Sequence, residues 1–478
     1  MSNIAKQQNM KASVRLTISL SAVLYGLIAF ASVQAYAETS LSLEQVLTSV
    51  KASLPKLMAM QQKQNSAQAK AQGSLGHWNP KLEMKSIAKP QGPFEYFAVN
   101  SELVQETPLW GAKLFAGYRF GQGEFPSYKD LKTLDVGEMR AGLELPLLKG
   151  RQLDEGRAEI SKRSRLLEQA TCALRNSEVD AVREASFAYW SWVFKRLYLK
   201  VQKELLGMAE SRAQALKANV EHGSLPPIVI QDNERQILDR QAKVIEASRK
   251  LQSAMFKLSL YHRSPDLQPI VNPASKAPQN FPAPQQIELP HLSSDIQSLK
   301  QQHPLLCMLK KELSRYQVEV ELAQNNLAPS LNIKAFVGKD LGEGPAYLAP
   351  TELGAAVNLK WPLGLDKAQG ELDYYQATQA SVQTQLRGVM DQLVARLQSA
   401  RVDLETAYEQ TIIAKKQVEI ARLLVEAEQH KLEEGASDLV ILNLRELTYG
   451  KAEAAEFKAL ATYHKALAAY KSARGEAF

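Results

Sequence analysis

The sequence contains few of the residues on which enzymes and metalloproteins depend. Its 478 residues include two cysteines, Cys172 and Cys307, and seven histidines. Two cysteines do not make a disulfide scaffold, although they could pair in an oxidising compartment. No histidine has another ligand at a spacing typical of a strong metal motif, and HExxH, GxSxG and glycine-rich phosphate loops are missing. The sequence therefore predicts no catalytic residues, no metal site and no cofactor.

Charge of one sign is also scarce. The net charge is +7, of which Lys6, Lys11 and Arg15 contribute three before residue 37. The +4 that remains is spread over a long chain without a block of Lys and Arg, so it does not indicate a nucleic-acid partner.

Long apolar runs are confined to the N-terminus. The three basic residues precede an apolar run from Leu16 to Val33, and Ala35-Tyr36-Ala37 follows as a small-x-small cleavage site. This layout predicts a secretory signal peptide over residues 1–37; the alternative is an uncleaved membrane anchor. No later run is long enough for a transmembrane helix, so we expect an exported protein that does not cross a membrane with helices.

The rest of the chain contains a tandem repeat. Pro55 and Pro304 lie 249 residues apart, and so do Pro80 and Pro329. Each pair of prolines encloses a polar, Ala- and Gln-rich stretch with helical character. We place the first repeat at residues 38–263 and the second at 291–478, joined by a proline-rich connector at 264–290.

Each repeat then changes from helical to strand periodicity. Residues 82–87 and 331–336 alternate apolar and polar side chains, and so do residues 143–147 and 357–363. The pattern predicts two strands per repeat, or four per chain. The first repeat also has an insertion at about 91–135, with further possible strands at 102–107 and 113–120. It is either an enlarged surface loop or a long strand pair that reaches beyond a barrel.

Long helices follow the strands. No proline occurs from Arg151 to about Asn219 or from Asp366 to about Glu433. In the second segment, apolar and small residues recur every three or four positions from Leu386 to Val425, which is coiled-coil spacing. Nearly seventy helical residues at ~1.5 Å each form a rod of about 100 Å.

Each rod ends in a similar short break. The segments EHGSLPPIVIQ and EEGASDLVILN place Gly223 and Gly435 where a left-handed residue ends a helix. Pro226 suits a first helical turn, and Ser437 is an expected cap of the helix that follows. We interpret the two segments as the tips of helical hairpins, although two unrelated helix–turn–helix joints could also look alike.

Aromatic residues gather at one level of the first rod, between Phe187 and Tyr198. They predict core packing against a collar formed by the connector and the chain ends.

Together these features resemble the TolC-like outer membrane efflux channels. The resemblance covers almost all of the mature chain. It includes the opening segment SLSLEQVLTSVKASLPKL and the strand-to-helix passages ELPLLKGRQLDEGRAEI and LKWPLGLDKAQGELDYY. It implies a mostly α-helical coiled-coil tunnel joined to a trimeric 12-stranded β-barrel, with four strands per chain.

The resemblance also implies a function. Such a protein is a passive exit channel of a tripartite efflux or type I secretion system, located in the outer membrane of a Gram-negative bacterium and extending into the periplasm. Its partners are outer-membrane lipid, an inner-membrane pump and a periplasmic adaptor. The adaptor-docking tips match Gly223, Ser224, Leu225, Gly435, Ala436 and Ser437.

The periplasmic entrance departs from the family pattern. Inward aspartates of the family's best-known member match Ile441 and Leu444 here, with Asp438, Arg445 and Glu446 nearby. The apolar pair predicts a tight, hydrophobic resting entrance in place of an acidic ring.

Two other functions compete with the channel. One is a periplasmic coiled-coil adaptor, which would carry one hairpin where this chain has two. The other is a secreted coiled-coil enzyme or scaffold.

Overall fold

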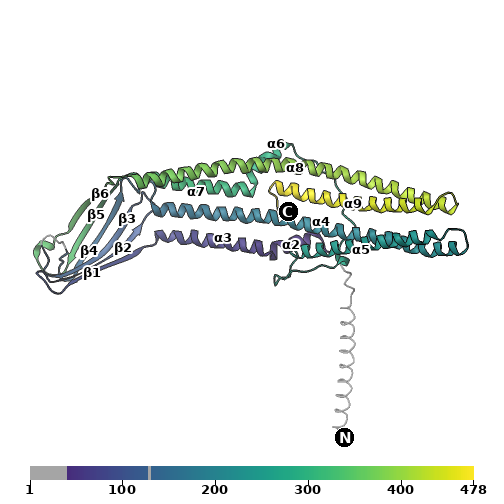
Figure 1. Ribbon diagram of the computed structural model, residues 1–478. Coiled ribbons are helices and arrows are strands. Elements are labelled where there is room, and N and C mark those ends of the chain that lie inside the picture. The colour runs from purple at the N-terminus through teal and green to yellow at the C-terminus, as the bar shows by residue number, and fades with distance from the viewer. Residues whose placement is uncertain (1–39, 127–130, 478) are drawn as a thin grey trace, which may run out of the picture.

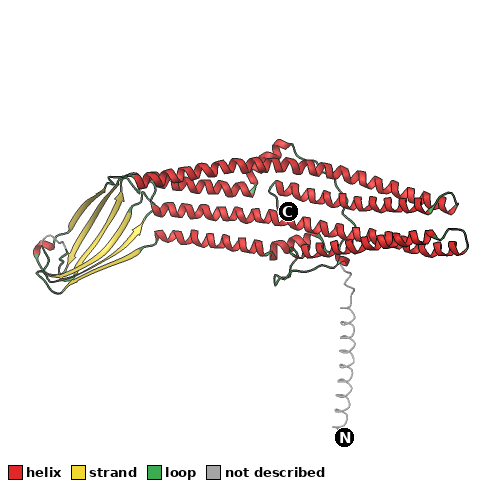
Figure 2. Ribbon diagram, viewed as in Figure 1, coloured by secondary structure: helices red, strands yellow, loops and turns green. Residues whose placement is uncertain are grey.

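The computed structural model describes residues 40–126 and 131–477, and the predicted signal peptide lies outside the described residues. The molecule is elongated, with a β-sheet at one end and two helical hairpins that reach the other end (Figures 1 and 2). The C-terminus lies part-way along the rod, where α9 ends.

The two repeats have the same order of helices along the chain. Each repeat has a short helix, a second helix that begins at a proline, strands, a long outgoing helix and a returning helix. The first set is α2 (Leu43–Ser53), α3 (Pro55–Ser74), α4 (Glu155–Glu221) and α5 (Ile228–Ser259). The second set is α6 (Leu292–Gln302), α7 (Pro304–Asn326), α8 (Asp366–Glu433) and α9 (Leu439–Ala473). Within the described residues, no helix has an apolar stretch of the length that crossing a bilayer requires.

The two long helices confirm the predicted rods. Helix α4 has 67 residues and α8 has 68, which correspond to about 100 Å each. The predicted seam of α8 is buried at Leu393, Leu397, Leu404 and Thr411. Helix α8 packs on α9 and α7, while α4 packs on α3, α5, α7 and α9.

The sheet has six strands among the described residues, so the predicted four strands per chain are wrong. Their bounds are β1 (Lys81–Lys89), β2 (Tyr96–Glu106), β3 (Lys113–Gly123), β4 (Gly137–Pro146), β5 (Ser330–Leu341) and β6 (Glu352–Lys360). The order is β1-β2-β3-β4-β5-β6 and every neighbouring pair is antiparallel.

The two additional strands lie in the segment that the sequence left open. Strand β2 contains residues 102–106 of the first possible strand, and β3 contains the whole of the second at 113–120. They pair with β1 and β4, so the segment is part of the sheet and not an enlarged surface loop. Asn100, Ser101 and Glu102 break the alternation of β2, and Gly117, Gly121 and Gly123 leave one face of β3 with few side chains. These residues weaken the local strand signal, so only pairing with neighbours reveals the hairpin.

The sheet has one apolar and one polar face. Residues paired across neighbouring strands share a face. The first face is predominantly apolar: Leu82, Met84, Phe97, Val99, Leu103, Leu114, Tyr118, Phe120, Met139, Leu143, Leu331, Ile333, Val337, Leu353, Val357 and Leu359. The second is predominantly polar: Lys81, Glu83, Lys85, Asn100, Glu102, Arg119, Glu138, Arg140, Glu144, Asn332, Lys334, Asp340, Glu352 and Asn358. Many residues of the apolar face are exposed in the single chain, for example Leu353 at 85%.

The aromatic cluster packs as predicted. Trp192 is fully buried in α4, and the Tyr189 hydroxyl donates to the Leu41 carbonyl at 2.8 Å. The Trp190 ring stacks on His464 of α9 and on Phe281 of the connector, with centroids 4.2 and 5.7 Å away. The connector, Leu41 and α9 therefore contact α4 at one level.

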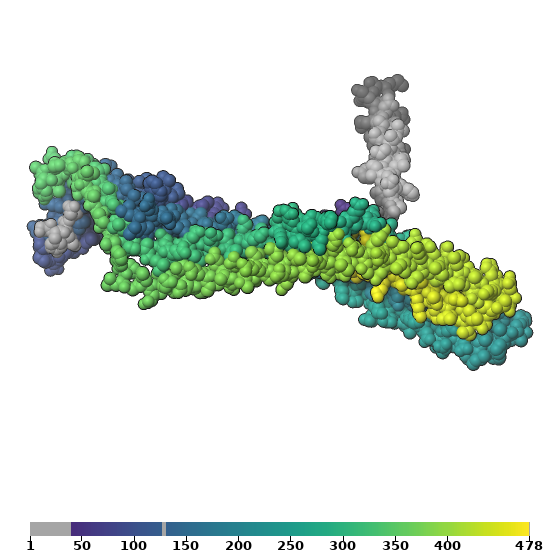
Figure 3. Space-filling model, turned by 90° about the horizontal axis from the view of Figure 1, so that it is seen from above, coloured from purple at the N-terminus to yellow at the C-terminus, as the bar shows by residue number. Residues whose placement is uncertain are grey.

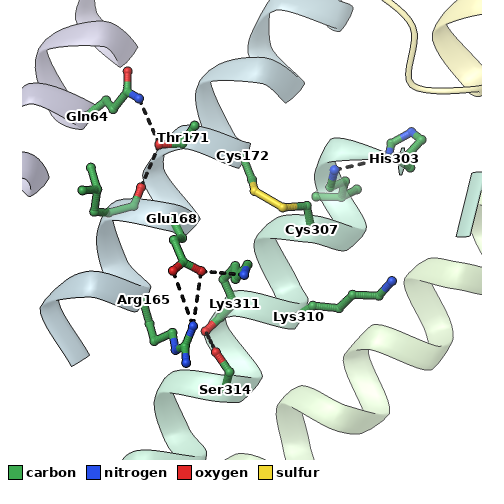
Figure 4. The surroundings of a disulfide bond; sticks show 12 residues. Gln64, Arg165, Glu168, Thr171, Cys172, His303, Cys307, Lys310, Lys311 and Ser314 are labelled. Carbon is green, nitrogen blue, oxygen red and sulfur yellow. Dashed lines mark hydrogen bonds and ion pairs between the residues drawn. A yellow bond between two sulfur atoms is a disulfide. The ribbon is translucent and has the colours of Figure 1, made fainter. Parts of the chain in front are cut away.

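Cys172 and Cys307 form a disulfide that joins α4 to α7 and so links the two repeats (Figure 4). Close to the disulfide, the Glu168 carboxylate of α4 forms an ion pair with Lys311 of α7 at 2.5 Å. Gln64 of α3 donates to the Thr171 hydroxyl at 2.9 Å. Three helices are thus held together near the disulfide.

His303 gives the rod a dependence on pH. It is the N-cap of α7, where its Nδ1 accepts from the Leu305 amide at 3.2 Å, and it is only 5% exposed. Burial lowers its pKa to about 4, the positive charge of Arg396 adds to this, and Asp180 opposes it. The folded protein therefore binds the His303 proton less readily than the unfolded chain does.

We predict that His303 lowers stability as the pH falls from about 6.5 towards 4. In this window the unfolded chain binds the proton and the folded chain does not, so the loss approaches about 3 kcal/mol. His303→Asn keeps a cap acceptor without a titrating group and should reduce the fall in thermal midpoint between pH 7 and pH 4.5. His430→Asn, at a position with a 79% exposed side chain, is the control. Equal falls in wild type and His303→Asn would contradict the prediction.

Candidate functional site

The hairpin tips have the backbone geometry expected from their glycines. Gly223 and Gly435 both have φ +73°. At the first tip, the Gly223 amide donates to Val220 and the Ser224 amide to Asn219. The second tip repeats this pattern. Both tips are Schellman motifs, which satisfy carbonyls at a helix end and favour glycine.

The helices that leave the tips differ from the expected caps. Helix α9 is capped by Asp438, whose carboxylate accepts from the Ile441 amide at 2.9 Å. The Ser437 hydroxyl instead donates to Glu428 of α8 at 2.5 Å, so its predicted role as the cap is wrong. Helix α5 begins at Ile228, so Pro226 lies before its first turn and not within it. Asp and Ser are both good caps, and only the position of the first turn distinguishes them.

The tips are exposed and small at their ends. Gly223, Ser224, Gly435 and Ala436 are exposed, and nothing lies within 4 Å of where a side chain would start on either glycine. Leu225 and Ser437 are half-buried. Large apolar side chains are exposed just beyond the tips: Ile228, Ile230, Val440, Ile441 and Leu444. An exposed apolar cluster of this kind is typical of a surface that another molecule covers.

The residues predicted at the entrance separate onto two sides of α9. Ile441 is 40% exposed and Leu444 is 62% exposed. Each nearby charged group already has a partner. Asp438 caps the helix, Arg445 pairs with Glu428 at 3.4 Å, and the buried Glu446 pairs with Arg212.

Glu446 belongs to a buried ionic network that the sequence analysis did not identify. Its carboxylate pairs with Arg212 of α4 and lies 3.5 Å from Arg240 of α5. Asn443 accepts from Arg212 at 2.5 Å and from Arg240 at 3.3 Å. The network therefore ties the second hairpin to both helices of the first.

Burial and close packing surround this network. Arg240 is 3% exposed and also donates to the Leu205 carbonyl. Burial lowers the pKa of its guanidinium, while the charge of Glu446 opposes that shift. A side chain at Gly450 would start 2.6 Å from Leu205, so glycine permits α9 to approach α4 here. The helical spacing from Leu442 to Glu446 was the available signal, since it places a charge on the apolar side of α9.

Figure 3 shows the two hairpins side by side at the end of the molecule opposite the sheet. Within the described residues, no group of three His, Cys, Asp or Glu side chains is arranged to hold a metal ion. The arrangement suits a binding surface, in which small tips and apolar side chains stand on two hairpins joined by the network.

A protein-family comparison identifies part of the chain. Residues 296–476 match the family model described as outer membrane efflux protein. This part of the chain is similar to that family. The resemblance predicted from the sequence is thereby confirmed, and no curated protein matches the chain significantly.

Solved structures show the same fold. The outer-membrane channel OprN is 15% identical with a TM-score of 0.65, covering 91% of this chain and 89% of that one. The CmeC outer membrane channel of Campylobacter jejuni is 12% identical with a TM-score of 0.63, covering 91% and 86%. The open-state MtrE outer membrane channel of Neisseria gonorrhoeae is 13% identical with a TM-score of 0.63, covering 91% and 89%. At these identities, the comparisons establish a shared fold.

We predict that Glu446→Gln destabilises the protein by about 3–5 kcal/mol, because it leaves the buried guanidinium of Arg240 and the half-buried one of Arg212 without a carboxylate. Glu433→Gln is the matched control, since Glu433 lies near the same tip with a 76% exposed side chain. The thermal unfolding midpoint of both variants measures the effect. A change in Glu446→Gln no larger than in the control would show that the network contributes little.

Proposed function

We propose that this protein is a passive outer-membrane exit channel that works as a homotrimer. It receives substrate from an inner-membrane pump and a periplasmic adaptor, in a tripartite efflux or type I secretion system of a Gram-negative bacterium. The sheet lies in the outer membrane and the helical rod extends through the periplasm. No catalytic step and no cofactor take part.

One observation carries the proposal: the two faces of the sheet. A sheet with an apolar face towards lipid and a polar face towards water is the pattern of transmembrane β-barrels. Leu82, Val357 and Leu353 are 68%, 69% and 85% exposed on the apolar side, where lipid would cover them. Glu138, Arg140 and Glu352 form an ion-paired chain on the other side, which would face the lumen.

The edges of this sheet support assembly with further copies of the chain. Strands β1 and β6 have no outer neighbour within the described chain. Backbone groups that lack partners are costly in lipid, so the edges must pair with further copies. The adaptor and scaffold alternatives give no reason for so large an apolar sheet face.

We predict that cross-linking in whole cells captures trimers and that the protein fractionates with the outer membrane. Monomers inserted in lipid would leave both sheet edges open, so they should be absent. Cross-linking that stops at dimers, or a soluble monomer in the periplasmic extract, would contradict the proposal.

The adaptor is proposed to dock on the tips at Gly223, Ser224, Leu225, Gly435, Ala436 and Ser437. The small residues at both ends would let another helical hairpin approach closely. The similar geometry of the two tips suits a partner that binds the same motif twice in each protomer.

We predict that Gly223→Val combined with Gly435→Val abolishes efflux while outer-membrane levels stay normal. A left-handed backbone costs a residue with a side chain about 1–2 kcal/mol, so the tips should change shape locally. Gly388→Val is the control, because Gly388 is exposed within α8 and open space surrounds its Cβ position. Export at the wild-type level in the double variant would exclude docking at the tips.

The resting entrance is proposed to be tight and apolar, lined by Ile441 and Leu444 and opened when the adaptor moves the second hairpin. Two contacts support this proposal: the Asp438 carboxylate caps α9 through the Ile441 amide, and Arg445 forms an ion pair with Glu428. Both charged groups are therefore engaged within the protomer.

We predict that Ile441→Ser with Leu444→Ser raises the single-channel conductance of the trimer in planar bilayers, because apolar constrictions restrict ions by dewetting. Val402→Ser is the control, since Val402 is 59% exposed in the middle of α8. The unmodified channel should conduct poorly, with little block by trivalent cations from the periplasmic side. Strong cation selectivity with submicromolar trivalent block would instead indicate an acidic ring.

A further inference from the structure

We propose that the trimer closes an eighteen-stranded barrel, because each chain supplies six strands. In this barrel β2 and β3 form a membrane-spanning hairpin of the wall, and β6 of one protomer pairs with β1 of the next. The inference rests on the proposed function, which supplies the membrane and the trimer. It replaces the twelve strands that the family resemblance implied.

The first support is the hydrogen-bonded ladder. Strand β2 pairs with β1 from Tyr96 to Val104, and with β3 along its whole length from Tyr96 to Glu106. Strand β3 continues the sheet by pairing with β4 from Lys113 to Arg119. Both strands have 11 residues, and about 9–11 tilted residues span a bilayer. The hairpin therefore has the length and the pairing of a wall element.

The second support is the continuity of the two faces. Leu103, Leu114 and Tyr118 lie on the apolar face and are 48%, 49% and 40% exposed. On the other face, Glu102 of β2 and Arg119 of β3 continue the polar lining. The hairpin would lose this match if it lay inside the lumen, where its apolar face would meet water.

The third support is the turn between β2 and β3. It places Leu109 and Trp110 at the helical end of the sheet, where they are 72% and 64% exposed. Trp361 follows β6 at the same end and is 67% exposed. Exposed tryptophans at one level are typical of the membrane–water interface, so the turn reaches the same membrane boundary as β6.

The edge strands are suited to closing the ring. Strand β1 leaves the helical end at Lys81 and β6 returns to it at Lys360, so neighbouring copies would pair antiparallel. Leu82 and Met84 of β1 would continue the apolar face of Val357 and Leu359 in the adjacent protomer. Ring closure then satisfies both edges.

The lumen of an eighteen-stranded barrel also has room for a segment that folds inward. Residues 131–134 lie against the polar face, where the Leu134 amide donates to Asp340 at 3.0 Å and the Gly121 amide donates to the Thr133 hydroxyl at 3.1 Å. A side chain at Gly121 would start 1.9 Å from the Leu131 carbonyl oxygen. Barrels of 16–18 strands leave an aqueous channel, so three such segments fit within the wider lumen and narrow it.

Spin labels on single introduced cysteines test the position of the hairpin in reconstituted trimers, with the native disulfide intact. Labels at Met84, Ser101 and Ala116, all on the apolar face, should collide more with oxygen than with a water-soluble nickel chelate. A label at Asn100, on the opposite face of β2, should show the reverse order. These four sites include the matched pair Ser101 and Asn100, which differ by one position.

The outcomes separate the inference from the proposed function. If Met84 reports lipid while Ser101 and Ala116 report water, the hairpin lies outside the wall and the eighteen-stranded barrel is wrong, but the membrane channel stands. If Met84 also reports water, both are overturned.

Disulfide formation tests the closing contact. Met84→Cys is combined in one chain with Ala355→Cys, Val357→Cys or Leu359→Cys, three positions on the apolar face of β6. At least one of these double variants should form covalent trimers. Tyr118→Cys combined with Val357→Cys is the control, since β3 is an interior strand and should give no cross-link. Failure of all three pairs in an intact trimer would overturn the β1–β6 contact.

Discussion

The packing of α4 against both repeats is the interaction on which the rest of the rod depends. This helix contacts α2, α3 and α5 of its own repeat, and α7 and α9 of the second repeat. The buried Trp192 and Leu197 lie near its midpoint, within a cluster of buried apolar side chains. Toward the sheet, the Cys172–Cys307 disulfide joins α4 to α7. Toward the tip, the ion pair of Arg212 and Glu446 joins α4 to α9. A chain with two similar halves thereby becomes one body.

Packing changes along the rod in a way that suits a channel. Near the sheet, a disulfide and surface ion pairs fix neighbouring helices, and at the midpoint aromatic rings and the connector fill the core. Near the tips, apolar side chains are exposed and a buried ionic network joins the two hairpins. Since local opening is easiest where few buried contacts exist, the tip end is where a partner can move one hairpin relative to the other.

The candidate site was predictable in its backbone and not in its contacts. A glycine after a long helix specifies a left-handed residue, so the conformations of Gly223 and Gly435 follow from the local sequence. The choice of Asp438 over Ser437 as the cap depends on where the first turn begins. The pairing of Glu446 with Arg212 and Arg240 joins residues more than two hundred positions apart, and no local pattern encodes such a contact.

The sequence alone determined the long helices, the hairpin tips, the alternating strands β1, β4, β5 and β6, and the resemblance to the efflux channels. All of these are written in neighbouring residues, through helical spacing, glycine conformations and two-residue alternation. Only the tertiary structure decided that β2 and β3 join the sheet, that Cys172 pairs with Cys307, and that the hairpins share an ionic network. The physical reason is that strand pairing and buried contacts are non-local: polar residues and glycines in β2 and β3 weaken their own strand signal, and hydrogen bonds from β1 and β4 on either side supply what local propensity lacks.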